Sequence, residues 1–249
     1  MKLERIIAVR NSKTVYRDED TCIKVFGKDY SKSDVLNEAL NQARLEDTGI
    51  NVPKIHEVTV VDGKWAIVSD YVKGKSLAQL MEEDAENKEK YLEMLVDLQI
   101  KVQSERCPLL SRLKEKLNMR ICQSKLDATT RFDLHTRLEK MARPDQICHG
   151  DFNPSNIIIT ESGEVFILDW SHATQGNGSA DAAITYLLFH VQGDSESAEK
   201  YLNMYCEKTE TEKDYILKWM PIVAAAESVR YKDKDEEMLL SWVTNQKEM

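Results

Sequence analysis

Long hydrophobic runs are missing from this sequence. The most apolar stretch, Ala182–Val191, is far too short to cross a bilayer, because a spanning helix needs about 20 apolar residues. Residues 1–13 also lack the layout of a signal peptide, since charged residues interrupt their short apolar run. We therefore expect a cytoplasmic protein without a membrane partner.

Cysteine is scarce and the paired spacing of redox and zinc sites is absent. The sequence has five cysteines, and none of them forms a CxxC pair. An odd number of cysteines without an export signal predicts reduced thiols rather than a disulfide framework.

An excess of basic residues is also lacking. Lys and Arg number 34 against 43 Asp and Glu, which gives a formal net charge of -9. Nucleic acids and anionic membranes need a basic face, so we expect no nucleic-acid partner. Residues 191–249 carry 13 acidic and eight basic residues. This excess suits a cationic small molecule, and it suits equally the outer faces of amphipathic helices.

What is present is an ordinary globular composition. The 249 residues are 42% hydrophobic and 31% charged, which argues against general disorder. Domains usually contain about 100–200 residues, so this length allows one large domain or two small lobes. We find no internal repeat.

The N-terminal part has the pattern of an antiparallel sheet with one helix. A helix is predicted over residues 31–47, capped by Ser31 or Ser33. Asp62-Gly63 is a typical hairpin turn, and residues 71–75 read as a linker. Five runs rich in β-forming residues predict strands: residues 5–9, 14–17, 21–26, 54–60 and 64–69.

The rest of the chain is mostly helical. Helices are predicted from residue 76 to about residue 141 and again from residue 180 onward, with apolar positions at helical spacing between Tyr91 and Val102. Between them, three short strands are expected over residues 146–148, 156–160 and 165–168. The order of elements predicts the α+β class.

Three oxygen-bearing side chains follow short strands in the middle of the chain. Asp151 and Asn156 flank one loop, and antiparallel pairing would carry Asp169 back beside Asn156. Asn156 and Asp169 offer the hard oxygen ligands that suit Mg²⁺ on nucleotide phosphates. Asp151 would then accept a proton from an attacking hydroxyl group. The alternative is that Asp151 and Asn156 are only turn formers.

The motif His149-Gly150-Asp151-x-x-x-x-Asn156, followed by Ile167-Leu168-Asp169-Trp170, resembles the catalytic loop and metal motif of the aminoglycoside phosphotransferase and choline kinase superfamily. These are protein-kinase-like small-molecule kinases, and the resemblance extends from about residue 5 to residue 190. It implies a two-lobed protein-kinase-like fold, with a nucleotide-binding lobe over residues 1–72 and a mostly helical catalytic and substrate-binding lobe over residues 73–249.

The resemblance also assigns residues to the nucleotide. Lys24 would hold the phosphates, and Glu38 would hold Lys24, although each alone fits an ordinary strand lysine or a solvated helix face. The backbone of Asp70 and Val72 would meet the adenine edge. Residues 10–14, where a glycine-rich phosphate loop is common, contain no glycine, and Ser12 is the expected phosphate contact there.

Two further residues are expected to support the catalytic loop. By the resemblance, His149 braces the loop and Asp181 hydrogen-bonds to it. Many relatives carry an acid two residues after the metal aspartate, where this sequence has Ser171. A role for that acid in binding metal or a cationic substrate is therefore not expected here.

The resemblance implies a kinase that moves the γ-phosphoryl group of ATP, or GTP, to a hydroxyl group of a small molecule, with Mg²⁺. Aminoglycoside-like and amino-alcohol acceptors, other sugars and homoserine-like molecules all fit the motif. The alternative is a nucleotide-binding pseudokinase that acts as a sensor or scaffold. A protein kinase is disfavoured because no Ala-Pro-Glu segment follows Asp169. The sequence determines neither the acceptor nor the oligomeric state.

Overall fold

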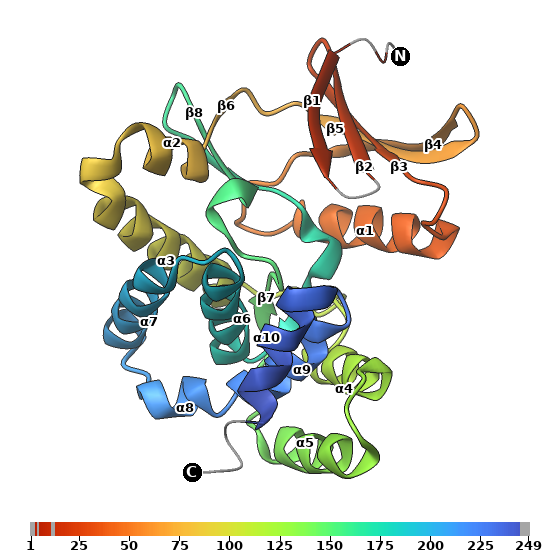
Figure 1. The fold of residues 1–249 in the computed structure, drawn as a ribbon. Coiled ribbons are helices and arrows are strands. Elements are labelled where there is room, and N and C mark those ends of the chain that lie inside the picture. The colour runs from red at the N-terminus through yellow and green to blue at the C-terminus, as the bar shows by residue number, and fades with distance from the viewer. Residues whose placement is uncertain (1–2, 4, 11–12, 245–249) are drawn as a thin grey trace. The chain divides into compact units, whose positions relative to one another are not determined.

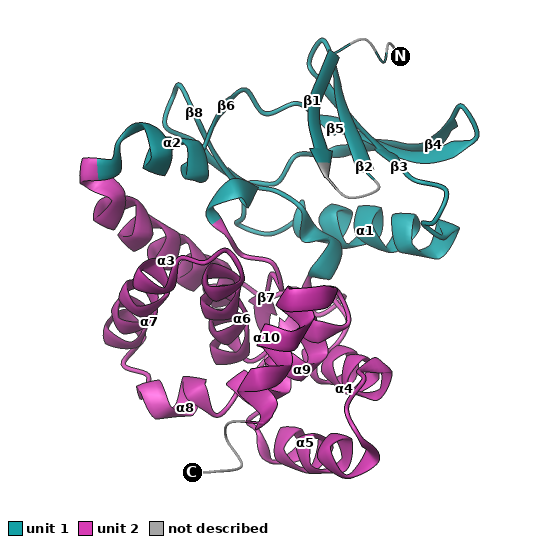
Figure 2. Cartoon of the chain, in the orientation of Figure 1, with its two compact units in different colours: residues 1–85, 154–172 teal, residues 86–153, 173–249 magenta. Residues whose placement is uncertain are grey.

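The computed structural model describes residues 3, 5–10 and 13–244. These residues form two compact units (Figure 2): those described up to residue 85 together with 154–172, and residues 86–153 together with 173–244. This division differs from the predicted lobes of residues 1–72 and 73–249, because residues 73–85 and 154–172 both belong to the first unit.

The N-terminal unit is built on an antiparallel sheet. Its strands are β1 (Arg5–Arg10), β2 (Lys13–Asp18), β3 (Thr21–Phe26), β4 (Ile55–Val61) and β5 (Lys64–Asp70), in the order β1-β2-β3-β5-β4. Asp62 and Gly63 join β4 to β5 with positive φ angles of 50° and 72°, as the Asp-Gly turn of a hairpin requires. All five predicted strands are therefore present.

One helix lies against this sheet (Figure 1). Helix α1 (Lys32–Leu45) begins after Ser31, whose side chain accepts a hydrogen bond from the Asp34 backbone in a capping box. The apolar side of α1 packs on the sheet through four buried residues: Val35, Ala39, Phe26 and Ile67. This packing fixes which side chains of α1 face β3.

A second, small sheet completes the unit, with β6 (Gly74–Ser76) paired to β8 (Ile157–Thr160) and β8 paired to β9 (Val165–Ile167). The predicted linker thus contains the start of a strand. A Cβ atom on Gly74 would lie 2.3 Å from the Ile159 carbonyl oxygen, so only glycine fits the close approach of β6 to β8. Helix α2 (Leu77–Glu83) follows β6.

The other unit is mainly helical. Its helices are α3 (Lys88–Ser104), α4 (Leu113–Gln123), α5 (Ala128–Lys140), α6 (Gly178–Val191), α7 (Ser195–Thr209), α8 (Lys213–Leu217), α9 (Met220–Ser228) and α10 (Asp233–Thr244). Helix α6 is buried on all sides over residues 178–189, which explains its continuous apolar sequence. Strand β7 (Gln146–Cys148) pairs with β10 (Thr174–Gly176), a strand that the sequence pattern missed. The α+β class is confirmed.

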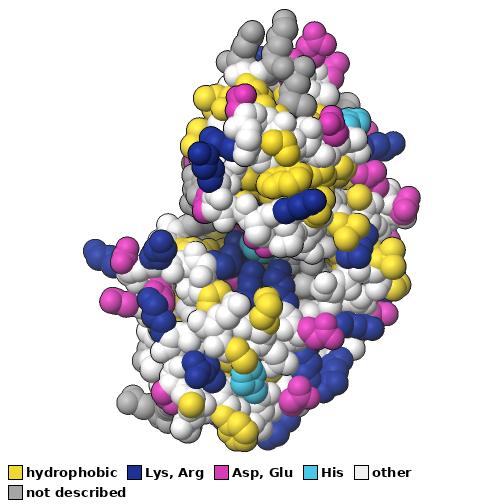
Figure 3. All heavy atoms as spheres, turned by 90° about the vertical axis from the view of Figure 1, so that its right-hand side faces the viewer, with side chains coloured by type: hydrophobic (Ala, Val, Ile, Leu, Met, Phe, Trp, Pro, Cys, Tyr) yellow, Lys and Arg dark blue, Asp and Glu magenta, His cyan; other side chains and the backbone are white. Residues whose placement is uncertain are grey.

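Two expectations from composition can be compared with the structure. Within the described part of the chain, no helix combines the length and the apolar character needed to cross a membrane. All five cysteines are free thiols. On the face drawn in Figure 3, Lys and Arg side chains are interspersed with Asp and Glu side chains.

Candidate active site

The predicted site residues are distributed over both units. The N-terminal unit holds those expected to bind nucleotide and metal, and the helical unit holds those of the catalytic loop. Ser12, the expected phosphate contact, lies outside the described residues.

Lys24 and Glu38 form an ion pair between β3 and α1. Lys24 Nζ lies 2.5 Å from Glu38 Oε1. Glu38 is only 5% exposed, which excludes the reading of a solvated helix face. A buried carboxylate needs a cation, so this pair fixes the direction of the Lys24 side chain.

A second lysine, which sequence reasoning did not identify, shares the same carboxylate. Lys13 Nζ on β2 lies 2.9 Å from Glu38 Oε2. It also lies over the Phe26 and Tyr30 rings, 5.1 and 5.2 Å from their centroids. Lys13 on β2 is paired with Phe26 on β3, and this strand register is the feature that brings Lys13 to the same site.

Lys24 also approaches the aspartate of the second motif. Its Nζ is 3.4 Å from Asp169 Oδ1. Burial alone would lower the pKa of Lys24, but the carboxylates of Asp169 and Glu38 outweigh burial and raise this pKa above its ordinary value. Lys24 therefore stays a cation, directed at once toward α1 and toward the end of β9.

The β8–β9 hairpin places Asn156 and Asp169 near each other. Ile157 is paired with Ile167, and the Leu168 backbone N–H donates to the Asn156 carbonyl oxygen at 2.8 Å. Asn156 is 2% exposed. Asp169 has a positive φ of 60° and accepts a hydrogen bond from Ser171 Oγ at 3.0 Å. Ser171 thus orients the aspartate.

The donor chemistry here fits Mg²⁺. Among residues 3, 5–10 and 13–244, no three His, Cys, Asp or Glu side chains are placed to hold a metal ion. Magnesium on a nucleotide does not need such a group, because one or two protein oxygen ligands, phosphates and waters complete its shell. The Asp169 carboxylate and the Asn156 amide are ligands of that kind.

The expected adenine contacts lie at the end of β5. The Asp70 side chain accepts a hydrogen bond from the Lys54 backbone at 3.0 Å and lies 2.7 Å from His56 Nε2. These contacts hold the segment that leads to the half-buried Val72. The Asp70 side chain is thus tied to β4, which is consistent with a role through its backbone alone.

In the helical unit, the loop after β7 is closely held. Gly150 has a positive φ of 76°, and its backbone N–H donates to Asp181 Oδ1 at 2.7 Å. His149 is fully buried, packs edge-on against Phe152 and accepts a hydrogen bond from the Asp151 backbone at 3.2 Å. The imidazole thus faces the loop backbone.

Three further side chains support this loop, and the sequence reading named none of them. Gln99 on α3 donates to Asp181 Oδ2 at 3.0 Å and to Thr185 Oγ1 at 3.1 Å. Thr185 in turn donates to the Phe152 carbonyl oxygen at 3.0 Å, and Tyr201 donates to Gln99. The only sequence signal is a glutamine and a threonine at apolar positions of helices.

Asp151 itself is partly exposed and lies near a buried ion-pair network. Arg230 Nη2 is 3.7 Å from Asp151 Oδ1. Glu227 on α9 binds Arg230 with one carboxylate oxygen, at 2.6 Å, and Arg120 on α4 with the other. Glu227 and Arg230 are three residues apart, but Arg120 and Asp151 come from distant parts of the sequence, so no local motif marks the network.

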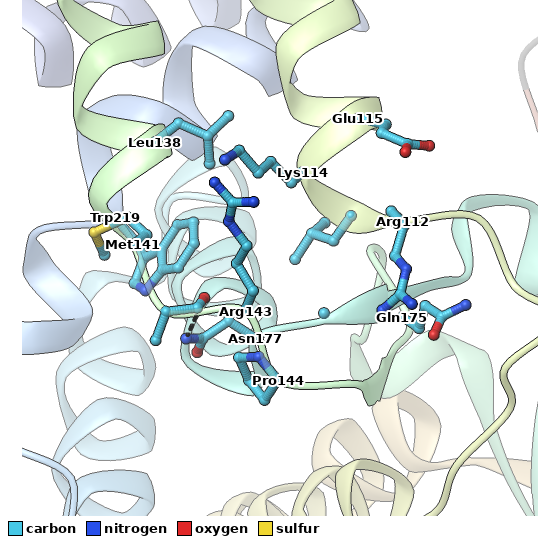
Figure 4. Close-up of a pocket in the computed structure, with 13 residues that line it drawn as sticks. Arg112, Lys114, Glu115, Leu138, Met141, Arg143, Pro144, Gln175, Asn177 and Trp219 are labelled. Atoms are coloured by element: carbon cyan, nitrogen blue, oxygen red, sulfur yellow. Dashed lines mark hydrogen bonds between the residues drawn. The ribbon is translucent and has the colours of Figure 1, made fainter.

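A separate pocket of about 300 Å³ lies within the helical unit (Figure 4). Its lining includes Lys114, Arg143 and Trp219. Glu139 pairs with Lys114 at 2.5 Å and with Arg143 at 2.7 Å, so these two cations share one carboxylate. None of the predicted site residues lines this pocket.

Comparison with known proteins adds a family and a fold. Residues 4–217 match the family model described as "Phosphotransferase enzyme family". A comparison with curated proteins found no match.

Solved structures give the fold. A choline/ethanolamine kinase family protein from Mesorhizobium loti has a TM-score of 0.62 at 14% identity, covering 100% of this chain and 89% of that one. Choline kinase LicA from Streptococcus pneumoniae has a TM-score of 0.64 at 15% identity, and the match covers 98% of this chain and 94% of that one. A mutant of aminoglycoside phosphotransferase APH(4)-Ia, in complex with ADP and hygromycin B, has a TM-score of 0.68 at 10% identity. That match covers 97% of this chain and 90% of that one.

Proposed function

The chain belongs to the phosphotransferase enzyme family, and from this membership we propose that it transfers the γ-phosphoryl group of ATP, or of GTP, to a hydroxyl group of a small molecule. Similar structures contain ADP or AMP, which supports a nucleotide donor. One of them holds hygromycin B, and another is a choline kinase, which supports a small-molecule acceptor.

The observation that carries the proposal is the ordered contact from Glu38 to Lys24 to Asp169. The distances are 2.5 and 3.4 Å, and all three side chains are largely withdrawn from water. A lysine held between a helix glutamate and a metal-type aspartate is the arrangement that positions nucleotide phosphates in kinases. An ion pair with a purely structural role would need Glu38 and Lys24 but would not need Asp169.

In this proposal, each residue has a defined task. Lys24 holds the phosphates, and the backbone at Asp70 and Val72 meets the nucleobase. Asn156 and Asp169 would hold Mg²⁺, which when bound neutralises charge on the phosphates. Asp151 accepts the proton of the acceptor hydroxyl group.

The reaction balances as a displacement at phosphorus. The acceptor oxygen forms a bond to the γ-phosphorus, and the bond from that phosphorus to the β–γ bridging oxygen breaks. The electron pair leaves with ADP, and the hydroxyl proton passes to the Asp151 carboxylate. Asp181 and His149 keep the loop that carries Asp151 in place.

Asp151→Asn tests the proposal. We expect kcat to fall by about 100- to 10,000-fold, because general-base assistance contributes that much, with nucleotide affinity unchanged. The measurement is ATP consumption with a panel of hydroxyl acceptors, beside nucleotide binding by calorimetry.

Asp145→Asn is the matched control, since Asp145 is exposed and pairs only at the surface with Arg106. Near wild-type phosphorylation by Asp151→Asn would refute the assigned role. Nucleotide binding by the wild type without turnover of any acceptor would favour the alternative, a nucleotide-binding sensor or scaffold.

A further inference from the structure

A group of basic side chains lies next to Asp151 in the helical unit. Lys116 and Arg120 are one turn apart on α4, and Arg230 follows the end of α9. Arg120 and Arg230 meet at Glu227. Burial and the neighbouring Arg120 and Arg230 guanidinium groups lower the pKa of Lys116 well below its ordinary value, so the two arginines are the cations of this group. The Asp151 carboxylate acts to raise the pKa of both Arg120 and Arg230, so two guanidinium groups lie close to it, in contrast to the acidic balance of the whole chain.

Apart from Asp151, two carboxylates lie beside these cations, and both are already bound. Glu227 is 1% exposed, and each of its oxygens contacts one arginine. Asp181 is fully buried and accepts from the Gly150 backbone and from Gln99. Neither carboxylate can reach an ammonium group of a ligand without breaking the packing of the loop.

Of the two arginines, Arg230 is the more accessible. Its side chain is 22% exposed, and Nη1 is directed to Glu227 and, at 3.4 Å, to the Gly150 carbonyl oxygen. Nη2 is 3.7 Å from Asp151 Oδ1, beyond hydrogen-bond distance. A guanidinium group held by one edge presents its other N–H groups in a plane that matches carboxylate and phosphate oxygens.

The charge of Arg230 is secured. Burial alone would lower its pKa, but the Glu227 and Asp151 carboxylates outweigh burial and raise the pKa above its ordinary value. The guanidinium is thus a permanent cation, oriented by Glu227, whose position Arg120 fixes in turn.

We propose that Arg230 is a specificity residue that binds an oxyanion of the acceptor, a carboxylate or a phosphate, and so places the acceptor hydroxyl group at Asp151. The inference rests on the proposed function and names the substrate class of the same site. It departs from the cationic acceptor that the charge of residues 191–249 suggested. Because Arg230 and Asp151 are 3.7 Å apart, the acceptor carries its hydroxyl group within a few bonds of its anionic group.

The first test compares matched acceptors with ATP. Glycerate, 3-hydroxybutyrate and glycerol 3-phosphate are the anionic members. Glycerol and 1,3-butanediol are their neutral counterparts, and ethanolamine and choline are the cationic ones. We expect turnover of anionic members only, with kcat/KM reduced at least about 100-fold in Arg230→Gln, as for loss of a close charge pair. Turnover of choline or ethanolamine while the anionic members are refused would overturn the inference and leave the proposed function intact.

The second test needs no turnover. Inorganic phosphate is titrated into the full chain saturated with ADP and magnesium, so that the nucleotide site is filled. We expect the phosphate Kd to rise at least about tenfold in Arg230→Gln and less in Arg230→Lys, which keeps the charge without the fork. Arg137→Gln is the control, since Arg137 lies on α5 and pairs with Asp133 of the same helix.

These measurements separate the two ideas. Thermal unfolding of each variant checks that it folds, and Arg230→Lys preserves a partner for Glu227 if Arg230→Gln does not fold. An unchanged phosphate Kd in Arg230→Lys and in every folded Arg230→Gln sample would overturn the inference. Failure of the wild type to bind ADP would instead contradict the proposed function.

Discussion

At the scale of single residues, the candidate site depends on carboxylates that each hold two cations. Glu38 joins Lys13 and Lys24 in one unit, and Glu227 joins Arg120 and Arg230 in the other. A buried charge is costly unless it is paired, so both glutamates are fixed and fix their partners. Function and local stability therefore depend on the same ion pairs.

Glu227 makes the stability of the helical unit sensitive to acid. Burial alone would raise its pKa, but the Arg230 and Arg120 guanidinium groups outweigh burial and lower the pKa below 4.5. A lowered folded-state pKa gives stability that is present above pH 4.5 and is lost as the pH falls through the folded value. We expect the free energy of unfolding, measured with urea between pH 7 and pH 3, to fall less steeply in Glu227→Gln.

The quantity compared is the slope of the free energy of unfolding against pH, because every other carboxylate titrates in both the wild type and Glu227→Gln. Glu210→Gln, at the end of α7, is the control and should keep the wild-type slope. An identical pH dependence in the wild type and Glu227→Gln would show that Glu227 has the same pKa in the folded and unfolded chain.

At the scale of elements, the sequence predicted what depends on neighbouring residues. The five strands and α1 follow from alternation, an Asp-Gly turn and a serine cap, all of which are local signals. Strands β6 and β10 did not show in the pattern, because their three residues include no apolar side chain, whereas the equally short β7 and β9 contain Ile147 and Val165. Tertiary pairing decides such strands.

The same distinction applies to the candidate site. The motif residues Asp151, Asn156 and Asp169 could be proposed from the sequence because their spacing is local. Lys13, Gln99 and Arg230 were missed, because each reaches the site through a contact with a residue far away along the chain. A single sequence contains no signal for such contacts.

Gly74→Ala tests the close approach of β6 to β8. The added methyl group would lie 2.3 Å from the Ile159 carbonyl oxygen, which is backbone and cannot rotate away. We expect a loss of about 1–3 kcal/mol in the free energy of unfolding, as for other overpacked sites, measured by urea denaturation. Lys75→Ala is the control, since the exposed Lys75 side chain pairs at the surface with Glu83. Equal stability of the two variants would mean that β6 moves freely away from β8.

At the scale of the whole molecule, the proposed tasks are divided between the units. The phosphate-holding and metal-type residues belong to the N-terminal unit, and Asp151 belongs to the helical unit. The chain passes from one unit to the other between Asn153 and Pro154, inside the motif that links Asp151 to Asn156. Nucleotide binding and chemistry should therefore be separable by mutation.

Lys24→Met tests this separation through ligand-induced stability. A ligand that binds only the folded state at about 100 times its Kd adds about 2.7 kcal/mol to the free energy of unfolding. We expect ADP with magnesium, at the concentration that gives this gain in the wild type, to stabilise Asp151→Asn equally and Lys24→Met hardly at all, measured by thermal and urea unfolding. Lys64→Met, an exposed lysine of the same sheet, is the control. Full stabilisation of Lys24→Met by ADP would show that Lys24 does not hold the phosphates. Loss of this stabilisation in Asp151→Asn would show that nucleotide binding also depends on Asp151, so that binding and chemistry are not separable.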